Sequence, residues 1–163
     1  MLTYMATLRE AVRTGRFGLF ELPEWERRPP LRPRCVTPEL LSWADDAQRL
    51  HDVTIGGRTL FEHLAQFFCD FRCSADVHYG DIRRMLPTKA GIWRMYPPGL
   101  RVYGWCPARH AFIAVTGAVE ADTERDRRLN DRKRDEVLRF ASRAGLTHSI
   151  LTGDSVAVFP HQG

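Results

Sequence analysis

Residues 91–119 (GIWRMYPPGLRVYGWCPARHAFIAVTGAV) constrain the fold more than any other stretch of the chain. They contain three short runs rich in Val, Ile, Trp, Tyr and Phe, at 92–96, 101–105 and 111–119. Such runs are typical of strands. Prolines separate them, and because proline offers no N–H to a sheet, these prolines belong in the connections. The pattern predicts a three-stranded antiparallel meander.

Helical patterns precede this meander. Thr37-Pro38-Glu39 combines a hydroxyl that can cap a helix, a proline at the first helical position and an acid in the first turn. Apolar residues at helical spacing then predict a helix over 38–50. A second and more apolar helix is predicted over 59–72, where Thr59 and Glu62 have the spacing of a capping box. We expect an α+β fold, with helices segregated onto one face of a small antiparallel sheet.

A long charged helix is predicted after the meander, at about 124–144, opened by Thr123 and closed by Gly145. Between residues 124 and 136 it carries six bases and five acids. Mixed charges at helical spacing are typical of a solvated helix held by ion pairs. The alternative is a groove for a protein or nucleic-acid partner. That alternative needs three arginines on one face, namely Arg125, Arg128 and Arg132.

The 163 residues are expected to form one domain with an N-terminal extension. Apolar residues at helical spacing predict a short helix at 3–14, and a proline-rich, charged stretch follows at 23–33. We therefore place residues 1–36 in a helix and proline-rich extension, and residues 37–163 in the α+β domain. The hydrophobic fraction of 44% is sufficient for a core.

Positive charge is concentrated around the meander. The whole chain has a net charge of +4, from 24 basic and 20 acidic residues. Between residues 72 and 110, seven arginines or lysines stand against two aspartates, so this segment alone carries +5 (7 − 2). This concentration favours an anionic partner.

Several classes of protein receive no support from the sequence. No run approaches the roughly 18 apolar residues of a membrane helix, and the N-terminus has no apolar signal-peptide core, so we expect a cytoplasmic protein with no membrane partner. The four cysteines form no CxxC pair, and we expect free thiols and no metal or cofactor. A zinc site at Cys69, Cys73 and His78 is the weaker alternative. The chain has no P-loop, GxGxxG, HExxH or GxSxG motif.

A short motif connects the basic segment to the meander. Leu86 is followed by Gly91-Ile92-Trp93, then by Arg101-Val102-Tyr103 on the next strand and by the apolar run 112–117. Over about residues 80–143 this arrangement resembles the RelE/HigB/ParE superfamily of bacterial toxins, especially its HigB-like, phage-derived branch. In that family a leucine and Gly-Leu-Trp lead to an arginine-bearing hairpin.

The resemblance implies a toxin of a toxin–antitoxin pair, held inactive by a cognate antitoxin protein. It further implies cleavage of RNA, in particular of mRNA on the ribosome, by attack of the 2′-hydroxyl on the adjacent phosphate without a metal ion. The alternative is a non-enzymatic, ParE-like poison or binding module that acts on a protein such as DNA gyrase. Glu120-Ala121-Asp122 stands where HigB-like toxins carry a lysine pair, and this substitution favours the alternative.

Such a reaction requires cations that neutralise charge on phosphorus and groups that transfer two protons. Arg94 and Arg101 lie on neighbouring predicted strands and would converge on one phosphate if they share a face. Arg101 matches the family's arginine, so we expect its loss to be the most damaging. The candidate catalytic residues are Arg101, Arg94, Lys89, His110 and Tyr103, with Tyr96 as an alternative to Tyr103. The candidate RNA-binding residues are Arg83, Arg84 and Arg109.

Overall fold

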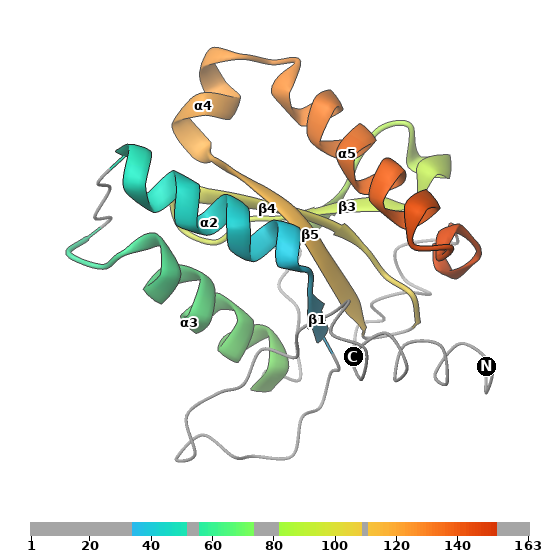
Figure 1. Ribbon diagram of the computed structural model, residues 1–163, viewed down its shortest axis with the longest axis horizontal. Helices are drawn as coiled ribbons and strands as arrows, with labels where there is room; N and C mark the ends of the chain where they lie inside the picture. Colours follow the sequence, from blue (N-terminus) through green and yellow to red (C-terminus); the bar gives the residue numbers. More distant parts are fainter. Residues whose placement is uncertain (1–33, 52–55, 74–81, 109–110, 153–163) are drawn as a thin grey trace, which may run out of the picture.

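In the computed structural model, a twisted five-stranded sheet has helices packed against both of its faces (Figure 1). The structure describes residues 34–51, 56–73, 82–108 and 111–152. The strands are β1 (Arg34–Val36), β2 (Ile82–Arg84), β3 (Ile92–Met95), β4 (Leu100–Trp105) and β5 (Phe112–Val119). The helices are α2 (Pro38–His51), α3 (Leu60–Cys73), α4 (Glu120–Arg125) and α5 (Leu129–Arg143), with 3₁₀ turns η2 (Thr88–Ala90) and η3 (Thr147–Ser149). The α+β fold predicted from the sequence is confirmed.

The predicted meander is present as β3, β4 and β5, each antiparallel to its neighbour. β2 extends it at one edge and β1 at the other, where β1 runs parallel to β5 and gives the order β1-β5-β4-β3-β2. β1 is not among the predicted strands, because three residues after a proline-rich stretch are too few for alternation to show. The sheet thus begins before residue 37. The division into 1–36 and 37–163 stays a prediction, and the predicted helix at 3–14 lies outside the described residues.

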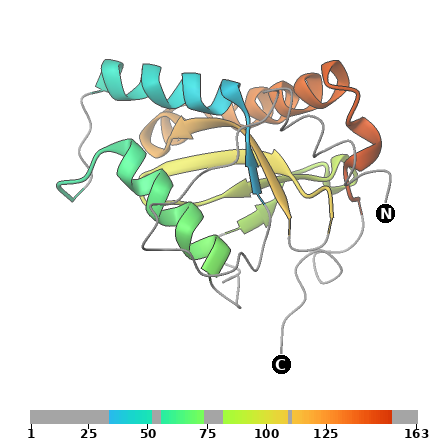
Figure 2. The same ribbon diagram turned by 60° about the horizontal axis from the view of Figure 1, so that its bottom comes forward.

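The two faces of the sheet carry separate cores (Figure 2). On one face α2 and α3 pack on the sheet, where Val102 and Ala114 are fully buried. On the opposite face α5 covers β4 and β5, where Tyr103 and Trp105 are fully buried. The expectation that the helices gather on one face is therefore wrong. The central strands are apolar on both faces, so each face requires a cover.

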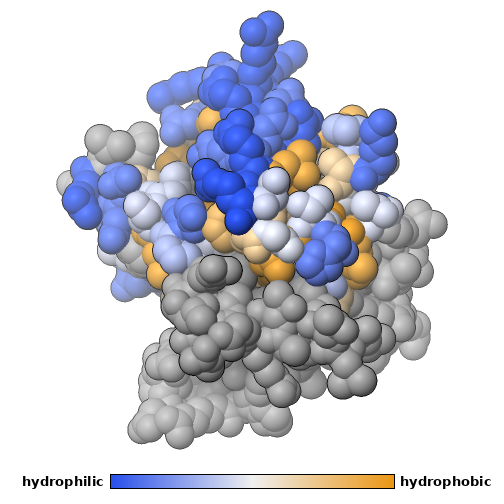
Figure 3. Space-filling model, turned by 45° about the vertical axis from the view of Figure 1, so that its right-hand side comes forward, coloured by the Kyte–Doolittle hydropathy of each residue, from blue (hydrophilic) through white to orange (hydrophobic). Residues whose placement is uncertain are grey.

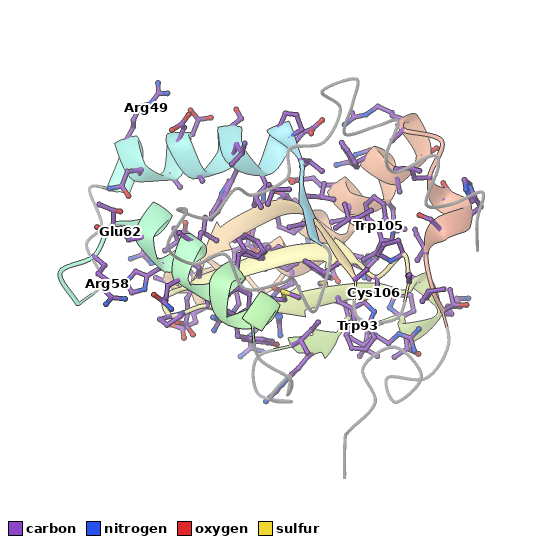
Figure 4. The ribbon with its side chains drawn as sticks, turned by 90° about the horizontal axis from the view of Figure 1, so that it is seen from below. Arg49, Arg58, Glu62, Trp93, Trp105 and Cys106 are labelled. Carbon is purple, nitrogen blue, oxygen red and sulfur yellow. The ribbon has the colours of Figure 1, made fainter. Side chains whose placement is uncertain are left out.

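The two predicted helix starts at Thr37 and Thr59 are confirmed. The Thr37 hydroxyl accepts from Leu40 N at 3.2 Å and donates to the carbonyl of Val115 at 3.1 Å, which ties the start of α2 to β5. At α3, Thr59 N donates to the Glu62 carboxylate at 2.6 Å and Glu62 N donates to the Thr59 hydroxyl at 3.2 Å. This reciprocal pair is the predicted capping box, at the helix end where Glu62 is labelled in Figure 4.

The predicted helix at 124–144 is present in two pieces, α4 and α5, with a break at residues 126–128. Thr123 does not open a helix. It lies inside α4, where its hydroxyl donates to the carbonyl of Glu120 at 2.7 Å. The Asp126 carboxylate instead accepts from Arg128 N at 2.9 Å and pairs with Arg132, so it holds the start of α5. Thr123 and Asp126 have the spacing expected at one helix start. In the structure Thr123 lies near the end of α4, and Asp126 lies just before the start of α5.

A close backbone approach determines one position of β4. A bulge between Tyr103 and Gly104 shifts the register against β5. A Cβ on Gly104 would lie 1.9 Å from the carbonyl oxygen of Ile113, so no other residue fits there without moving the strands. The bulge places both Val115 and Thr116 toward α5, where Thr116 donates to Glu136 at 2.9 Å. Within the described residues, no helix is long and apolar enough to cross a membrane.

Candidate functional site

Three guanidinium groups surround one tyrosine on the α5 face of the sheet. The Cζ atoms of Arg101, Arg94 and Arg83 lie 4.6, 4.8 and 5.5 Å from the centre of the Tyr96 ring. Cations at such distances are attracted to the electron-rich face of an aromatic ring. We call Arg83, Arg94 and Arg101, together with Tyr96, the arginine cluster. Like-charged side chains gather here because the tyrosine gives each of them a common partner.

Strand geometry explains why these side chains meet. Arg83 pairs with Arg94 across β2 and β3, and Arg94 pairs with Tyr103 across β3 and β4. Side chains at directly opposite positions share a face, as do side chains two apart on one strand. Tyr96 therefore points to the same side as Arg94, and Arg101 to the same side as Tyr103. The predicted convergence of Arg94 and Arg101 is present, although the two are diagonal to each other and meet over Tyr96.

Asn130, in the first turn of α5, connects this cluster to the helix. Its Oδ1 accepts hydrogen bonds from Arg94 Nη1 and from the Tyr103 hydroxyl, both at 2.7 Å. Arg94 also donates from Nε to the Tyr96 hydroxyl at 2.8 Å and from Nη2 to the same oxygen. The guanidinium of Arg94 is therefore fixed on two sides. A phosphate would meet it already oriented.

Arg101 is held by an acidic residue. Its Nη2 forms an ion pair with the Glu120 carboxylate, and its Nη1 donates to the carbonyl of Leu100 at 2.6 Å. Glu120 begins α4, which follows β5 directly, so the end of the meander carries this carboxylate to the arginine. The pair is partly exposed, with 14% of the Arg101 side chain and 38% of the Glu120 side chain accessible. Glu120 thus neutralises one of the three cations.

The cluster keeps unused hydrogen-bond donors. A guanidinium has five N–H groups. The described bonds use three of them on Arg94 and two on Arg101, which leaves two (5 − 3) and three (5 − 2). Arg83 is exposed and forms no ion pair with a described carboxylate. Bidentate contacts between arginine and phosphate need donors of this kind.

Tyr103 is poorly suited to transfer protons. Its side chain is fully buried, and burial raises its pKa to about 12, although the nearby guanidinium groups of Arg94 and Arg101 act in the opposite direction. A phenol with this pKa stays protonated at neutral pH and cannot act as a base there. Its hydroxyl is also committed to Asn130. Tyr96 is partly exposed, and its hydroxyl accepts from Arg94.

Two described candidates, Lys89 and Arg84, do not join the cluster. Lys89 is exposed on η2, at the end of β3 opposite Tyr96. Arg84 follows Arg83 in β2 and points to the α2–α3 face, where its Cζ lies 5.5 Å from the Trp93 ring centre. The expectation that Arg83 and Arg84 widen one patch therefore holds for Arg83 only, since neighbouring residues of a strand face opposite sides. Arg109 and His110 lie outside the described residues.

The surroundings of Arg84 are apolar. Its Nε and Nη2 are buried without a hydrogen-bond partner in the described part of the chain. Cys106, on the same face, is fully buried, and burial raises the pKa of its thiol well above the usual range. Trp93 and Cys106 belong to the core on the α2–α3 face and Trp105 to the core on the α5 face; Figure 4 labels all three. We find no chemistry for this group beyond packing and charge.

The charged surface of α4 and α5 consists largely of ion pairs, as the sequence predicts. Arg132 pairs with Asp126, and Lys133 with Glu136 at 3.0 Å. Arg134 reaches both Asp131 and Asp135 and also donates to the carbonyl of Leu86. Figure 3 shows strongly hydrophilic side chains gathered on the side of the molecule where α5 lies. Arg125, Arg128 and Arg132 do not lie on one continuous helix, because Arg125 ends α4, Arg128 precedes α5 and Arg132 lies within α5.

Two members of the site are not among the predicted residues. Asn130 is separated from Arg94 by 36 residues, and Glu120 from Arg101 by 19, so no local sequence pattern predicts either contact. Glu120 is noted in the sequence only as an acid where the resembling toxins carry a lysine. Among the described residues, no group of three or more His, Cys, Asp or Glu could hold a metal ion. The side chains of Cys69 and Cys73, and His78 as a whole, lie outside the described part.

The chain was compared with models of known protein families, with curated proteins and with solved structures, and none of the three comparisons gives a match. The assignment of a function therefore depends on the residues themselves and on the resemblance described above.

Proposed function

We propose that this protein is a RelE/HigB-like toxin that acts on RNA, with the arginine cluster as the site that holds the RNA backbone. The observation that carries the proposal is the convergence of three guanidinium groups on Tyr96. Arginine matches phosphate oxygens in a bidentate manner, and aromatic rings beside arginines are typical of sites for single-stranded RNA. The excess of positive charge in residues 72–110 supports the same proposal.

In the proposed reaction, the RNA 2′-hydroxyl attacks the adjacent phosphate, the P–O bond to the next 5′-oxygen breaks, and a cyclic phosphate and a free 5′-hydroxyl form. Arg94 and Arg101 stabilise the additional negative charge on the phosphate oxygens. Asn130 orients Arg94.

Tyr96 is assigned the proton of the 2′-hydroxyl, because Tyr103 is buried and stays protonated at neutral pH, and water supplies the proton to the leaving 5′-oxygen. His110 is not included, because it precedes Phe112 by two residues, and Phe112 begins β5 at the end opposite Ala118, the partner of Arg101. The proposed substrate is mRNA on the ribosome, and the proposed inhibitor is a cognate antitoxin.

The test compares purified variants in single-turnover cleavage and in RNA binding. Arg94→Ala and Arg101→Ala each remove one cluster cation. Arg127→Ala removes an exposed arginine in the α4–α5 turn, outside the cluster, and serves as the matched control. Losing one preorganised cation from such a site lowers the rate by roughly a hundredfold or more. Arg127→Ala should cleave at the wild-type rate. Absence of cleavage of any RNA, free or ribosome-bound, would remove the enzymatic part of the proposal.

Tyr96→Phe separates the two parts of the proposed site. It should abolish cleavage and leave RNA affinity within about twofold, because a proton-transfer group contributes to the chemical step and phenylalanine keeps the ring on which the arginines pack. Retention of the wild-type cleavage rate would contradict the assignment of Tyr96. Induction of the protein in cells should arrest growth and deplete transcripts. Growth without any loss of transcripts would count against an RNA target.

The second candidate function is a non-enzymatic poison or binding module of the ParE kind. The ion pair between Arg101 and Glu120 favours it, because the arginine expected to matter most for cleavage already has an acidic partner. An acidic segment of a target protein would fit the remaining donors of the cluster equally well. A supercoiling assay with purified DNA gyrase tests this candidate. Inhibition of gyrase without RNA cleavage would favour it over the first.

A further inference from the structure

The Glu120 carboxylate lies where the arginine cluster would receive an anion. It pairs with Arg101 Nη2, and the Arg101 guanidinium lies 4.6 Å from the Tyr96 ring centre. A carboxylate and a phosphate offer the same kind of oxygen acceptors to arginine. We propose that this position is a phosphate subsite, that Glu120 occupies it in the free protein, and that a phosphodiester of bound RNA takes its place. The inference rests on the proposed function. It identifies Glu120 as the residue that limits the affinity of the arginine cluster for RNA.

The exposure of the pair supports an exchange of partners. Of the Glu120 side chain, 38% is accessible, so its carboxylate can return to water when it leaves Arg101. A partly exposed ion pair contributes little net free energy, because each partner is well solvated when the pair is broken. The side chain stands in the first turn of α4, and turning it outward leaves the helix intact. Displacement of Glu120 therefore requires no change in the fold.

Arg101 itself stays in place when Glu120 leaves. Its Nη1 donates to the carbonyl of Leu100 at 2.6 Å, and its guanidinium packs on Tyr96. Arg94 and Arg83 lie on the same ring, with unused donors on Arg94. With Glu120 displaced, the cluster presents three cations to one phosphate. With Glu120 in place, the same position carries a net charge of +2 (3 − 1). The carboxylate thus competes with the ligand for one site.

The test uses two variants that remove the same charge from the same helix. Glu120→Gln frees Arg101, whereas Glu124→Gln alters an exposed residue of α4 that has no contact with the cluster among the described bonds. Binding of a short single-stranded 2′-O-methyl RNA, which cannot be cleaved by 2′-hydroxyl attack, is measured at several salt concentrations. Glu120→Gln should bind about fivefold more tightly than Glu124→Gln, the factor expected when a partly exposed ion pair no longer competes.

The salt dependence reports the number of phosphates held. For single strands, each additional phosphate contact steepens the plot of log affinity against log salt by about 0.7. Glu120→Gln and Glu124→Gln should both keep the wild-type slope, because bound RNA displaces Glu120 from Arg101 in the wild-type protein as well. Arg101→Ala in the Glu120→Gln background should remove the gain in affinity and make the slope shallower by about 0.7, because one phosphate contact is lost. Urea unfolding of all variants confirms that they remain folded.

Inorganic phosphate distinguishes a general phosphate subsite from one that needs the RNA chain. Phosphate should raise the thermal midpoint of Glu120→Gln more than that of Glu124→Gln if the subsite binds the free anion. Equal RNA affinities of the two variants, with wild-type binding intact, would overturn the inference and leave the proposed function standing. Failure of all three proteins to bind RNA would instead remove the proposed function. The subsite would then be retained if phosphate stabilises Glu120→Gln selectively, and rejected if it does not.

Discussion

Replacement of Asn130 by alanine tests whether the site is organised as described. The substitution removes the oxygen that accepts from Arg94 Nη1 and from the Tyr103 hydroxyl. Tyr103 is fully buried, so its hydroxyl would be left without a partner, which costs about 1–3 kcal/mol. Arg94 is only partly buried and can turn toward water, so the loss of its hydrogen bond to Asn130 lowers the unfolding free energy by only roughly 0.5 kcal/mol more. Alanine has a higher helix propensity than asparagine, which offsets about 0.5 kcal/mol of this loss by stabilising α5.

The net expectation is a decrease in unfolding free energy of about 2 kcal/mol. Urea unfolding followed by tryptophan fluorescence measures it, and a typical slope for a small protein gives a fall in midpoint of roughly 1 M. Asn130→Asp keeps the accepting oxygen and should stay within about 0.5 kcal/mol of wild type. Tyr103→Phe completes a double-mutant cycle, in which the coupling with Asn130→Ala should be about 1 kcal/mol. A coupling below about 0.3 kcal/mol would refute the account of Asn130 as the link between sheet and helix.

Three further predictions follow from the packing. Gly104→Ala should lower the unfolding free energy by more than about 3 kcal/mol, or prevent folding, because its Cβ would lie 1.9 Å from the oxygen of Ile113; near-wild-type urea stability would refute the described register. Cys106 should resist thiol reagents in the native protein and react only on unfolding, because its thiol is fully buried and burial raises its pKa. Mass spectrometry locates the labelled cysteine. Rapid labelling of Cys106 in the native protein would contradict this burial. The pKa of Tyr103 is about 10 in the unfolded chain and is raised to about 12 in the folded protein. The protonated hydroxyl therefore contributes fully to the free energy of unfolding below about pH 10, and this contribution is lost as the pH rises through 12. Tyr103→Phe should flatten this part of the stability curve, and an unchanged curve would exclude Tyr103 as its source.

Local sequence signals were sufficient for most of the fold. Prolines separated the strands of the meander, and the hydroxyl and acid spacings at Thr37 and Thr59 gave the starts of α2 and α3. The failures have a common cause, which is that the deciding contact is not local. β1 has three residues and exists because Arg34–Val36 can pair with β5. The break before α5 arises because the Asp126 carboxylate bonds forward to Arg128 and Arg132, a choice that spacing alone leaves open.

The candidate site was predictable where strand alternation determines it. Arg94 and Tyr96 are two apart, so a shared face follows from the strand alone. Whether Arg101 joins them depends on the register across the Pro97–Gly99 connection, which the sequence does not determine. Asn130 and Glu120 arrive from α5 and α4, and only the packing of these helices on the sheet brings them to the arginines.

The geometry assigns different parts of RNA recognition to different groups. Cation–π contacts with Tyr96 and hydrogen bonds to Asn130 and Leu100 orient the guanidinium groups before any ligand arrives, so binding a phosphate requires little ordering of these side chains. Cleavage additionally requires a group that can accept a proton near neutral pH. Tyr103 cannot do so, because burial keeps it protonated up to a pKa of about 12. A cluster built in this way supports phosphate binding whether or not the chain cleaves RNA. Cleavage depends on whether Tyr96 supplies the missing base, and for that reason affinity and single-turnover rate must be measured on the same variants.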